Sequence, residues 1–404
     1  MNETLLVGTA QRDITPPAGK PMAAFPRERD PVTPRIAEGA HDPLWVRALA
    51  LSDGRETVVV CSADVITFQW PDVDRMRRDF ADRTGLSPES LLPVGTHNHN
   101  GPECMYVFGG NPKDDYIDML RIQVVDAACE ALDRSGPAAV SAASVDTRIA
   151  YNRRRISPDG RFRQRSVNED REPIGPTDPK VTVIRFDRPE GPPVCAVLHF
   201  AAHPVILTTP NTHFTAEYPG ALLRHFQEMT GLENALFLQG ACGDTHPFLA
   251  RADTLEAVEE MGLQLADAAR TACEQASREQ DLSLSIRRWD GSVPNRCDEG
   301  LRVRLEIAAV RLSPRLALVF LPGEPFVELS LSLQWRSPFA RTVVVGYALG
   351  SCGYVPNRQA YENGGYGVDL YTTDPAEFSR TAVPPGTGER FVDEAVELLQ
   401  SLEP

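Results

Sequence analysis

The apolar and polar positions of the chain change their period in a regular order. Residues 57–64 are almost continuously apolar, which is typical of a buried strand. Residues 72–83 place their apolar side chains at helical spacing, and Gly85 follows as a helix stop signal. The apolar run at 91–96 predicts a second strand. Together these segments predict a strand–helix–strand unit.

The same order of patterns occurs twice more. The second unit has its strand, helix and strand at 194–202, 219–229 and 235–238, and the third at 316–321, 326–335 and 342–349. Further helical patterns cover 116–132, 255–273 and 391–402, and the alternating patterns of half-solvated strands cover 180–186 and 301–312. We therefore predict an α/β fold whose mixed β-sheet core is built from repeated strand–helix–strand units and flanked by helices.

Polar side chains follow the predicted strands at the points where the strands end. These residues are Asp64, His97, His203, Asp244, Glu324 and Tyr354. In open α/β sheets the carboxyl ends of the strands line the crevice where ligands bind. Polar residues follow many strands because loops are polar, and this explains Asp64. The same explanation is weaker for His97 and His203, because the chain has only eight histidines and two of them would follow strands by chance. The site is therefore expected at the carboxyl ends of the strands.

His97 and His99 follow the apolar strand at 91–96 directly. If the strand continues past Thr96, its period of two places both imidazoles on one face, as a metal site or an acid/base pair requires. An isolated His-x-His is more often a polar loop whose histidines form ordinary hydrogen bonds. The residues downstream therefore decide between these two interpretations.

Composition and charge exclude several classes of protein. The 404 residues are 42% hydrophobic, so a large core can form, and single α/β enzymes reach this length. The formal net charge of −15 argues against nucleic acid or an anionic membrane surface as a partner and favours a small-molecule substrate. No secretory signal or membrane-length apolar run is recognisable. The eight cysteines lack Cys-x-x-Cys spacing, so we expect reduced thiols in a cytoplasmic protein. The oligomeric state stays open, a homo-oligomer included.

Three of the strand-end residues suit a catalytic zinc site. His97, His203 and Glu324 are ligand types that zinc prefers, and three protein ligands plus a water are the catalytic pattern. Tyr354 is a less common ligand, since its phenol would have to ionise, and a hydrogen-bonding role in the pocket wall is an equal alternative.

Two acidic residues and one basic segment have an ordinary and a functional interpretation. Glu217 stands where a helix begins, so it is an N-terminal cap, or else a supporting carboxylate or general base. Asp244 is expected to orient a ligand histidine. The arginine-rich segment 148–171 is expected to be an exposed loop that screens acidic neighbours, or a lid that holds a carboxylate or an oxyanion.

Five segments in the same order resemble the neutral/alkaline ceramidases. Thr96-His97-Asn98-His99-Asn100-Gly101-Pro102 resembles the Thr-His-Thr-His-Ser-Gly-Pro signature of that family. The others are Phe200-Ala201-Ala202-His203-Pro204, Gly243-Asp244-Thr245-His246-Pro247, Leu321-Pro322-Gly323-Glu324, and Gly353-Tyr354 followed by Tyr366. The matches run through nearly the whole chain.

The resemblance implies a role for each matching residue. His97, His203, Glu324 and Tyr354 would hold one zinc ion. His99 would be a substrate-facing acid/base that titrates near neutrality, Tyr366 a hydrogen-bond donor to the substrate oxygen, and Arg153 a pocket arginine. A metal-activated water would attack the substrate while the cation and a tyrosine hydroxyl stabilise the oxyanion.

The sequence departs from the family pattern at two places. His246 stands where the family has a serine, so a role of that hydroxyl does not carry over. The chain ends at Pro404, so we expect one catalytic domain over 1–404 without the C-terminal immunoglobulin-like domain of the long ceramidases. We therefore expect a smaller, soluble amide as the substrate rather than ceramide.

The leading hypothesis is a zinc-dependent hydrolase of a carbon–nitrogen bond in a small, non-peptide amide. An ester or lactone hydrolase differs only in the leaving group. A second class is a metal-dependent lyase, cyclase or isomerase, in which His99 and Glu217 move protons and His246 is an additional acid/base. A third class is a non-catalytic binding protein, and the presence of all four expected zinc ligands argues against it.

Overall fold

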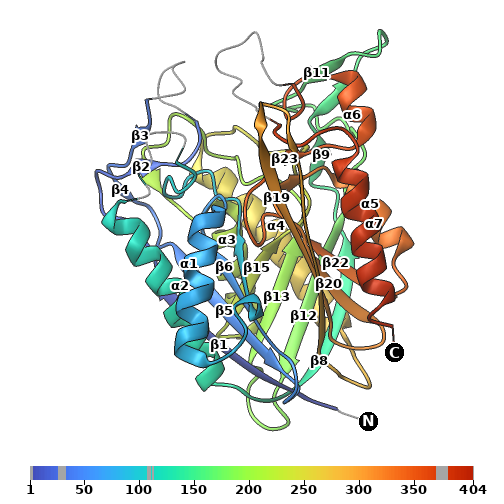
Figure 1. Cartoon of the computed structure of the whole chain (residues 1–404). Helices are drawn as coiled ribbons and strands as arrows, with labels where there is room; N and C mark the ends of the chain where they lie inside the picture. Colours follow the sequence, from blue (N-terminus) through green and yellow to red (C-terminus); the bar gives the residue numbers. More distant parts are fainter. Residues whose placement is uncertain (1–2, 26–32, 107–110, 112, 370–380, 404) are drawn as a thin grey trace.

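Two mixed β-sheets stacked face to face form the centre of the structure, with helices on both outer sides (Figure 1). The computed structural model describes residues 3–25, 33–106, 111, 113–369 and 381–403. In Figure 1, α1 and α2 lie at the left and α5 and α7 at the right, with strands of both sheets between them. The prediction of a mixed α/β fold flanked by helices is confirmed.

The larger sheet has nine strands among the described residues. Eight of them run in the order β15 (Ala235–Gln239), β13 (Cys195–Phe200), β12 (Lys180–Asp187), β8 (Gly136–Asp146), β1 (Leu5–Asp13), β5 (Trp45–Ser52), β6 (Thr57–Ala63) and β7 (Leu91–Gly95). The ninth, β17 (Ser277–Arg278), pairs with β8. The second sheet has the order β18 (Ser285–Asn295), β19 (Asp298–Arg311), β20 (Leu316–Phe320) and β22 (Arg341–Val345).

The three predicted strand–helix–strand units are all present. They are β6–α1–β7, β13–α3–β15 and β20–α5–β22, where α1 is Trp70–Thr84, α3 is Glu217–Thr230 and α5 is Val327–Arg336. In each unit the two strands are adjacent and parallel. Because parallel neighbours end at the same edge of a sheet, each unit delivers its carboxyl-end loops to one place.

The division into two sheets is a feature that the sequence pattern did not predict. Apolar side chains of both sheets interdigitate to form one core layer. Helices α1 and α2 (Asp115–Asp133) cover one half of the outer face of the larger sheet, and α3 and α4 (Leu255–Gln275) cover the other half. Helices α5 and α7 (Thr387–Gln400) cover the second sheet.

The packing of the two sheets brings the carboxyl ends of the three units together. Val94 of β7 bridges to Ala348, which follows β22, and Gly240 after β15 bridges to Val345 of β22. The second strand of the last unit, β22, ends at Val345, four residues earlier than predicted, because the chain turns there toward β7. The loops that follow strands of all three units therefore meet at one end of the molecule.

Short strand pairs order the loops at this end. They are β2 (Pro21–Met22) with β3 (Arg35–Ile36), β4 (Gly39–Ala40) with β14 (His213–Phe214), β9 (Ala150–Asn152) with β16 (Thr245–Pro247), β10 (Arg154–Ile156) with β11 (Phe162–Gln164), and β21 (Glu324–Pro325) with β23 (Tyr354–Val355). The remaining helical segments are η1 (Pro88–Ser90) and α6 (Arg358–Asn363). Across the described part of the chain, no helix has both the length and the apolar character that a bilayer crossing requires.

The arginine-rich segment 148–171 is not simply an exposed loop. Strands β9, β10 and β11 order parts of it, and Arg153 and Arg154 are buried, although other arginines of the segment are exposed. The antiparallel pairing of β9 with β16 is the physical reason, since it holds the start of the segment beside His246.

A buried ion pair links helix α1 to the second sheet. Arg77 of α1 donates to both carboxylate oxygens of Glu306 in β19, at 2.8 and 2.7 Å. Arg288 of β18 donates to the same carboxylate at 2.8 Å. Glu306 is 1% exposed, so these charges depend on one another rather than on water.

We predict that Glu306→Ala lowers the free energy of unfolding by about 3–5 kcal/mol, because it leaves buried guanidinium charge without its partner. Chemical denaturation measures this change. The control is Glu299→Ala at an exposed position of the same strand, for which we expect a change within about 0.5 kcal/mol. Equal losses in both variants would contradict the assigned importance of the buried pair.

Candidate metal centre and active site

His97 and His99 meet through a turn rather than along a strand. Strand β7 ends at Gly95, and His97 has a left-handed backbone with φ of 64°, so the expected extension past Thr96 does not occur. The two imidazoles nevertheless lie together, with their Nε2 atoms 3.1 Å apart. The turn aims both rings into the space where the three units end.

Backbone carbonyls orient the imidazoles of His97 and His203. Nδ1 of His97 lies 3.2 Å from the carbonyl oxygen of Ile66, and Nδ1 of His203 lies 2.6 Å from that of Cys242. A carbonyl can only accept, so each Nδ1 donates its proton, and in the neutral ring the lone pair is then at Nε2. Both Nε2 atoms face Oε2 of Glu324, at 3.3 and 3.4 Å. Burial lowers the pKa of His203 to about 3, which keeps this imidazole neutral.

Close backbone packing positions Glu324 and Tyr354. The two residues are partners in the parallel pair β21·β23. At Gly323 (φ 68°) a Cβ atom would lie 2.4 Å from the carbonyl oxygen of Gly353, so only glycine permits this approach. At Gly243 a Cβ atom would lie 2.5 Å from the carbonyl oxygen of Glu324. The glycines therefore let three loops contact one another at the site.

The donor atoms around Glu324 fit a small divalent cation. Nε2 of His203 and Oε2 of Glu324 are buried, and neither has a hydrogen-bond partner among the described residues. Ligand atoms of His97, His99 and His203 all lie within 4.8 Å of one another. Bonds of about 2.0–2.1 Å in a tetrahedral zinc site place neighbouring ligand atoms about 3.3 Å apart, close to the separations found here. The donor set of imidazole nitrogens and a carboxylate also suits zinc.

His99 differs from the other two histidines of the cluster. Its Nδ1 is buried without a hydrogen-bond partner in the described chain, whereas ligand histidines generally donate this proton to a fixed acceptor. Burial, with the neighbouring His97 and His203, lowers the pKa of His99 well below its ordinary value. This direction opposes the near-neutral titration expected from the sequence. The shift therefore favours the neutral imidazole at His99.

Arg153 lies between the cluster and two tyrosines. Its Nη2 donates to the Tyr354 hydroxyl at 3.2 Å and to the carbonyl oxygen of Gly243 at 2.6 Å. The guanidinium carbon lies 4.8 Å from the ring centroid of Tyr366, which is cation–π range. The rings of Tyr354 and Tyr366 contact each other edge to face, with centroids 5.6 Å apart. Arg153, Tyr354 and Tyr366 thus form one wall of the site.

His246 supports this wall. Nη1 of Arg153 lies 3.2 Å from Nε2 of His246, and since a guanidinium only donates, His246 accepts at this atom. Burial and the charge of Arg153 lower the pKa of His246 well below its ordinary value. In this arrangement His246 holds Arg153 and is not available there as the additional acid that the sequence suggested.

Asp244 does not contact a ligand histidine. Its Oδ1 accepts from the backbone N–H of Val327 at 2.8 Å, and its Oδ2 accepts from the side chain of Asn152 at 2.7 Å. Asp244 therefore caps the first turn of α5 and attaches β9 to it. The predicted contact with a ligand histidine is therefore not formed. The actual partners of Asp244 come from parts of the chain far away in sequence, and the sequence pattern does not show that they lie near it.

Glu217 holds the loop that follows His203. Its carboxylate accepts three backbone N–H groups, from Ile206 at 2.5 Å, Leu207 at 2.9 Å and Tyr218 at 2.8 Å. It lies in the first turn of α3, as expected for a capping residue, but with a left-handed φ of 56°. Burial raises the pKa of Glu217 to about 7 although the three N–H groups oppose this shift.

Two residues of the site were not identified from the sequence. The ring of Tyr347 stacks on His97 with centroids 3.9 Å apart, and its hydroxyl lies 3.0 Å from Sγ of Cys242. The predicted strand at 342–349 included Tyr347. Had the strand been predicted to end at Val345, Tyr347 would have counted among the residues that follow a strand. Arg35, which is 1% exposed, donates to the carbonyl oxygen of His99 at 2.8 Å. It lies in a proline-rich segment that carries no pattern, so no sequence signal marks it.

Comparison with known proteins places this fold. No protein-family model and no curated protein sequence matches the chain. The structure is similar to a neutral ceramidase from Pseudomonas aeruginosa, with a TM-score of 0.76 and 17% identity over 100% of this chain and 75% of that chain. It is also similar to a ceramidase complexed with C2, with a TM-score of 0.76 and 16% identity over 99% of this chain and 75% of that one. The chain therefore has the ceramidase fold that the motif resemblance implied.

We predict that Glu217 makes stability fall as the pH rises. Its pKa of about 7 in the folded protein exceeds the ordinary 4.5, so the folded state binds more protons between these values. Relative to Glu217→Gln, whose amide does not titrate, the native protein should lose about 3 kcal/mol of unfolding free energy as the pH rises from 4.5 to 7.

Denaturation of both proteins across this range measures the difference. A difference that does not change with pH would mean that the three N–H groups fully offset the burial of the carboxylate.

Proposed function

We propose that this chain is a ceramidase-superfamily hydrolase, a zinc-dependent enzyme that cleaves the carbon–nitrogen bond of a small, soluble amide. The observation that carries the proposal is the buried cluster in which Nε2 of His97 and of His203 face Oε2 of Glu324. The similar structures are ceramidases, which supports an amide as the bond that is cleaved. The described residues around the cluster supply the other groups that amide hydrolysis needs.

His97, His203 and Glu324 would hold the metal, with the Tyr354 hydroxyl as the fourth protein ligand. Carbonyl oxygens fix the tautomers of both histidines, as is common around zinc sites. Burial, with the neighbouring Glu324 carboxylate, raises the pKa of the Tyr354 hydroxyl well above its ordinary value, and Arg153, which donates to that hydroxyl, opposes the shift. A bound zinc ion supplies Lewis acidity and lowers the pKa of a coordinated water to about 7.

The remaining groups move a proton and stabilise negative charge. His99 lies beside the cluster, with its Nε2 3.1 Å from Nε2 of His97, and is the residue that would accept a proton from an attacking water. The imidazolium so formed can then protonate the leaving nitrogen. Tyr366, partly exposed beside Arg153, is the group assigned to donate to the developing oxyanion. His246 keeps Arg153 in place for this step.

The contacts of Glu217 and His246 favour hydrolysis over a lyase, cyclase or isomerase reaction. That alternative relied on both residues as proton carriers. All three hydrogen bonds of Glu217 go to backbone N–H groups, and His246 accepts from Arg153. Neither group is presented to the cluster as an acid. An ester or lactone hydrolase would use the same groups, so the nature of the leaving atom rests on the ceramidase fold.

We predict that His203→Ala and Glu324→Ala each lose the bound zinc together with activity, because each removes a donor from a site of few ligands. Elemental analysis of purified protein measures zinc per chain, and the native protein should contain one ion. His225→Ala is the matched control, since His225 binds Glu259 on the surface and should keep full metal content. Full metal content and turnover in either site variant would show that this assignment of the site is wrong.

Isotope incorporation tests the reaction class. Small N-acyl compounds and their ester analogues are screened first, and the best substrate is then turned over in water enriched in oxygen-18. We predict that one labelled oxygen enters the carboxylate product and that amides react in preference to the matched esters. Product without the label would favour the lyase, cyclase or isomerase alternative, and faster turnover of the esters would move the assignment to an esterase.

A further inference from the structure

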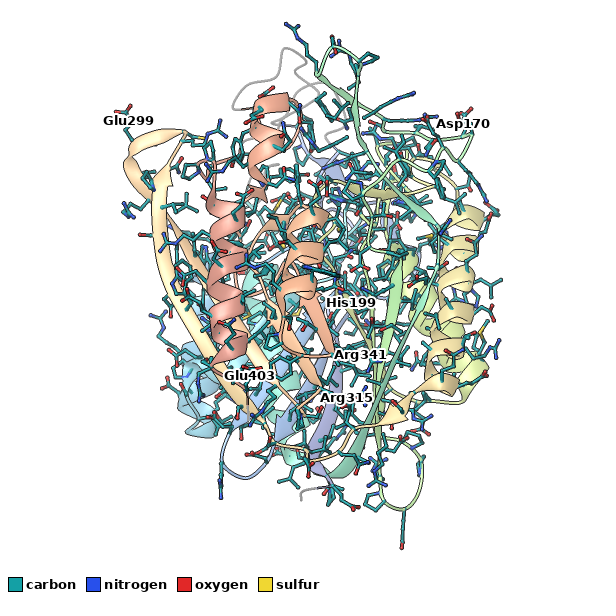
Figure 2. All side chains as sticks on the ribbon, turned by 90° about the vertical axis from the view of Figure 1, so that its right-hand side faces the viewer. Asp170, His199, Glu299, Arg315, Arg341 and Glu403 are labelled. Atoms are coloured by element: carbon teal, nitrogen blue, oxygen red, sulfur yellow. The ribbon has the colours of Figure 1, made fainter. Side chains whose placement is uncertain are left out.

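A cavity of about 540 Å³ lies between the two sheets, apart from the metal cluster. Its walls come from β8, β12, β13 and β22 and from helix α5 with the residues that follow it. Figure 2 shows His199 beside α5 and Arg341 near it at the start of β22. Its volume is in the range of small-molecule sites. None of its lining residues belongs to the proposed catalytic groups.

The floor of the cavity is polar. It lies on the face of the larger sheet whose preceding residues are apolar and belong to the core. Val197, Ile184 and Ala142 form one row across three strands and pack into the layer between the sheets. Two positions further along the same face, the next row is His199, Thr182 and Ser144. His199 and Thr182 are 4% and 5% exposed, so this row is not simply a solvated sheet edge. Buried polar groups need partners, and the hydroxyls of Ser144 and Thr182 supply one another's at 2.9 Å, which leaves His199.

His199, which lines the cavity, has an unused acceptor. Its Nε2 donates to the carbonyl oxygen of Val344 at 2.9 Å, so the proton is at Nε2 and Nδ1 carries a lone pair. Nδ1 is buried and has no hydrogen-bond partner among the described residues. Burial also lowers the pKa of His199, which keeps the ring neutral. A ligand with an O–H or N–H group would satisfy this nitrogen.

Two cations at the mouth have donors to spare. Nζ of Lys180 donates to Oε1 of Gln334 at 2.8 Å, which uses one of its three N–H bonds. Arg341 reaches Glu279 only at 3.6 Å. Asp178, the acidic residue of the lining, already accepts from the Gln334 side chain at 2.7 Å and from the Lys180 backbone at 3.2 Å. The mouth therefore favours an anionic group, and Lys180 is two residues from Thr182 on the same face of β12.

The rim carries an aromatic side chain that packs against little of the protein. Trp335, which lines the cavity, is 90% exposed, the highest value among the exposed large hydrophobic residues described. Leu331 and Phe339 add apolar surface to the same lining. A flat apolar group of a ligand could cover this surface.

We propose that the cavity binds a small organic acid that combines a carboxylate, a neighbouring hydroxyl or N–H group and an apolar ring. The carboxylate pairs with Lys180 and Arg341, the O–H or N–H donates to Nδ1 of His199, and the ring packs on Trp335. His199 lies on β13 and His203 in the loop that follows this strand, four residues later, but the cavity does not depend on a metal or on the proposed reaction.

The test uses 3-phenyllactate as the probe, in calorimetric titrations of the native protein and of His203→Ala. We expect equal affinity in both proteins, because the cavity does not contain His203. Lys180→Gln should weaken binding about tenfold through loss of a charged contact. Arg287→Gln, which removes a charge at an exposed position outside the cavity, should leave the affinity unchanged.

Two related compounds test the other contacts without altering the protein. 3-Phenylpropanoate lacks the hydroxyl and should bind about fivefold more weakly. 3-Phenyl-1,2-propanediol lacks the carboxylate and should show a loss like that of Lys180→Gln. The proposal is overturned if 3-phenyllactate binds only when His203 is present, if Lys180→Gln binds it as tightly as the native protein, or if the three compounds bind equally. Failure of the zinc assignment would change none of these results.

Discussion

Two backbone carbonyl groups fix the orientation of the imidazoles in the candidate metal site. The carbonyl oxygens of Ile66 and Cys242 each accept the Nδ1 proton of one histidine, and this directs the lone pairs of His97 and His203 toward Glu324. The carbonyls can do so only because the loops after β6, β7, β13, β15 and β20 meet where the two sheets pack together. Gly243 and Gly323 remove the side chains that would hold these loops apart. The positions of Arg153 and Tyr354 follow from the same contacts.

Much of the fold was predictable because it depends on local periodicity. Each of the three strand–helix–strand units was visible as a change of period, and in the structure the two strands of each unit are parallel neighbours. The stacking of two sheets was not predictable, since it depends on which apolar faces meet across distant parts of the chain. His97, His203 and Glu324 could be selected as candidate ligands because they follow strands, and the structure brings the three side chains together. Asp244 could not be assigned correctly, because its partners, the backbone N–H of Val327 and the side chain of Asn152, are far away in sequence. Glu217 was predicted as a cap, but no sequence pattern showed that it also holds the backbone of the loop at Ile206 and Leu207.

The departure at His246 can be understood from its contact with Arg153. An imidazole at this position fills more space than a serine and still offers the guanidinium an acceptor. The histidine therefore changes how the arginine wall is supported and does not add a proton carrier to it. His199 shows the opposite situation, with an acceptor that the protein itself leaves unused. Both histidines are neutral, and only the second faces a cavity that a ligand could fill.

The most direct test of this account is a crystal structure of the protein grown with zinc, with anomalous data collected on both sides of the zinc absorption edge. The account predicts one ion bonded to Nε2 of His97, Nε2 of His203, the Glu324 carboxylate and the Tyr354 hydroxyl oxygen, with His99 outside the bonding distance of about 2.0–2.1 Å. An ion bonded to His99 in place of Glu324 would contradict the assignment of Glu324 as a metal ligand and of His99 as the proton carrier. Absence of an anomalous peak within the cluster would contradict the metal site itself.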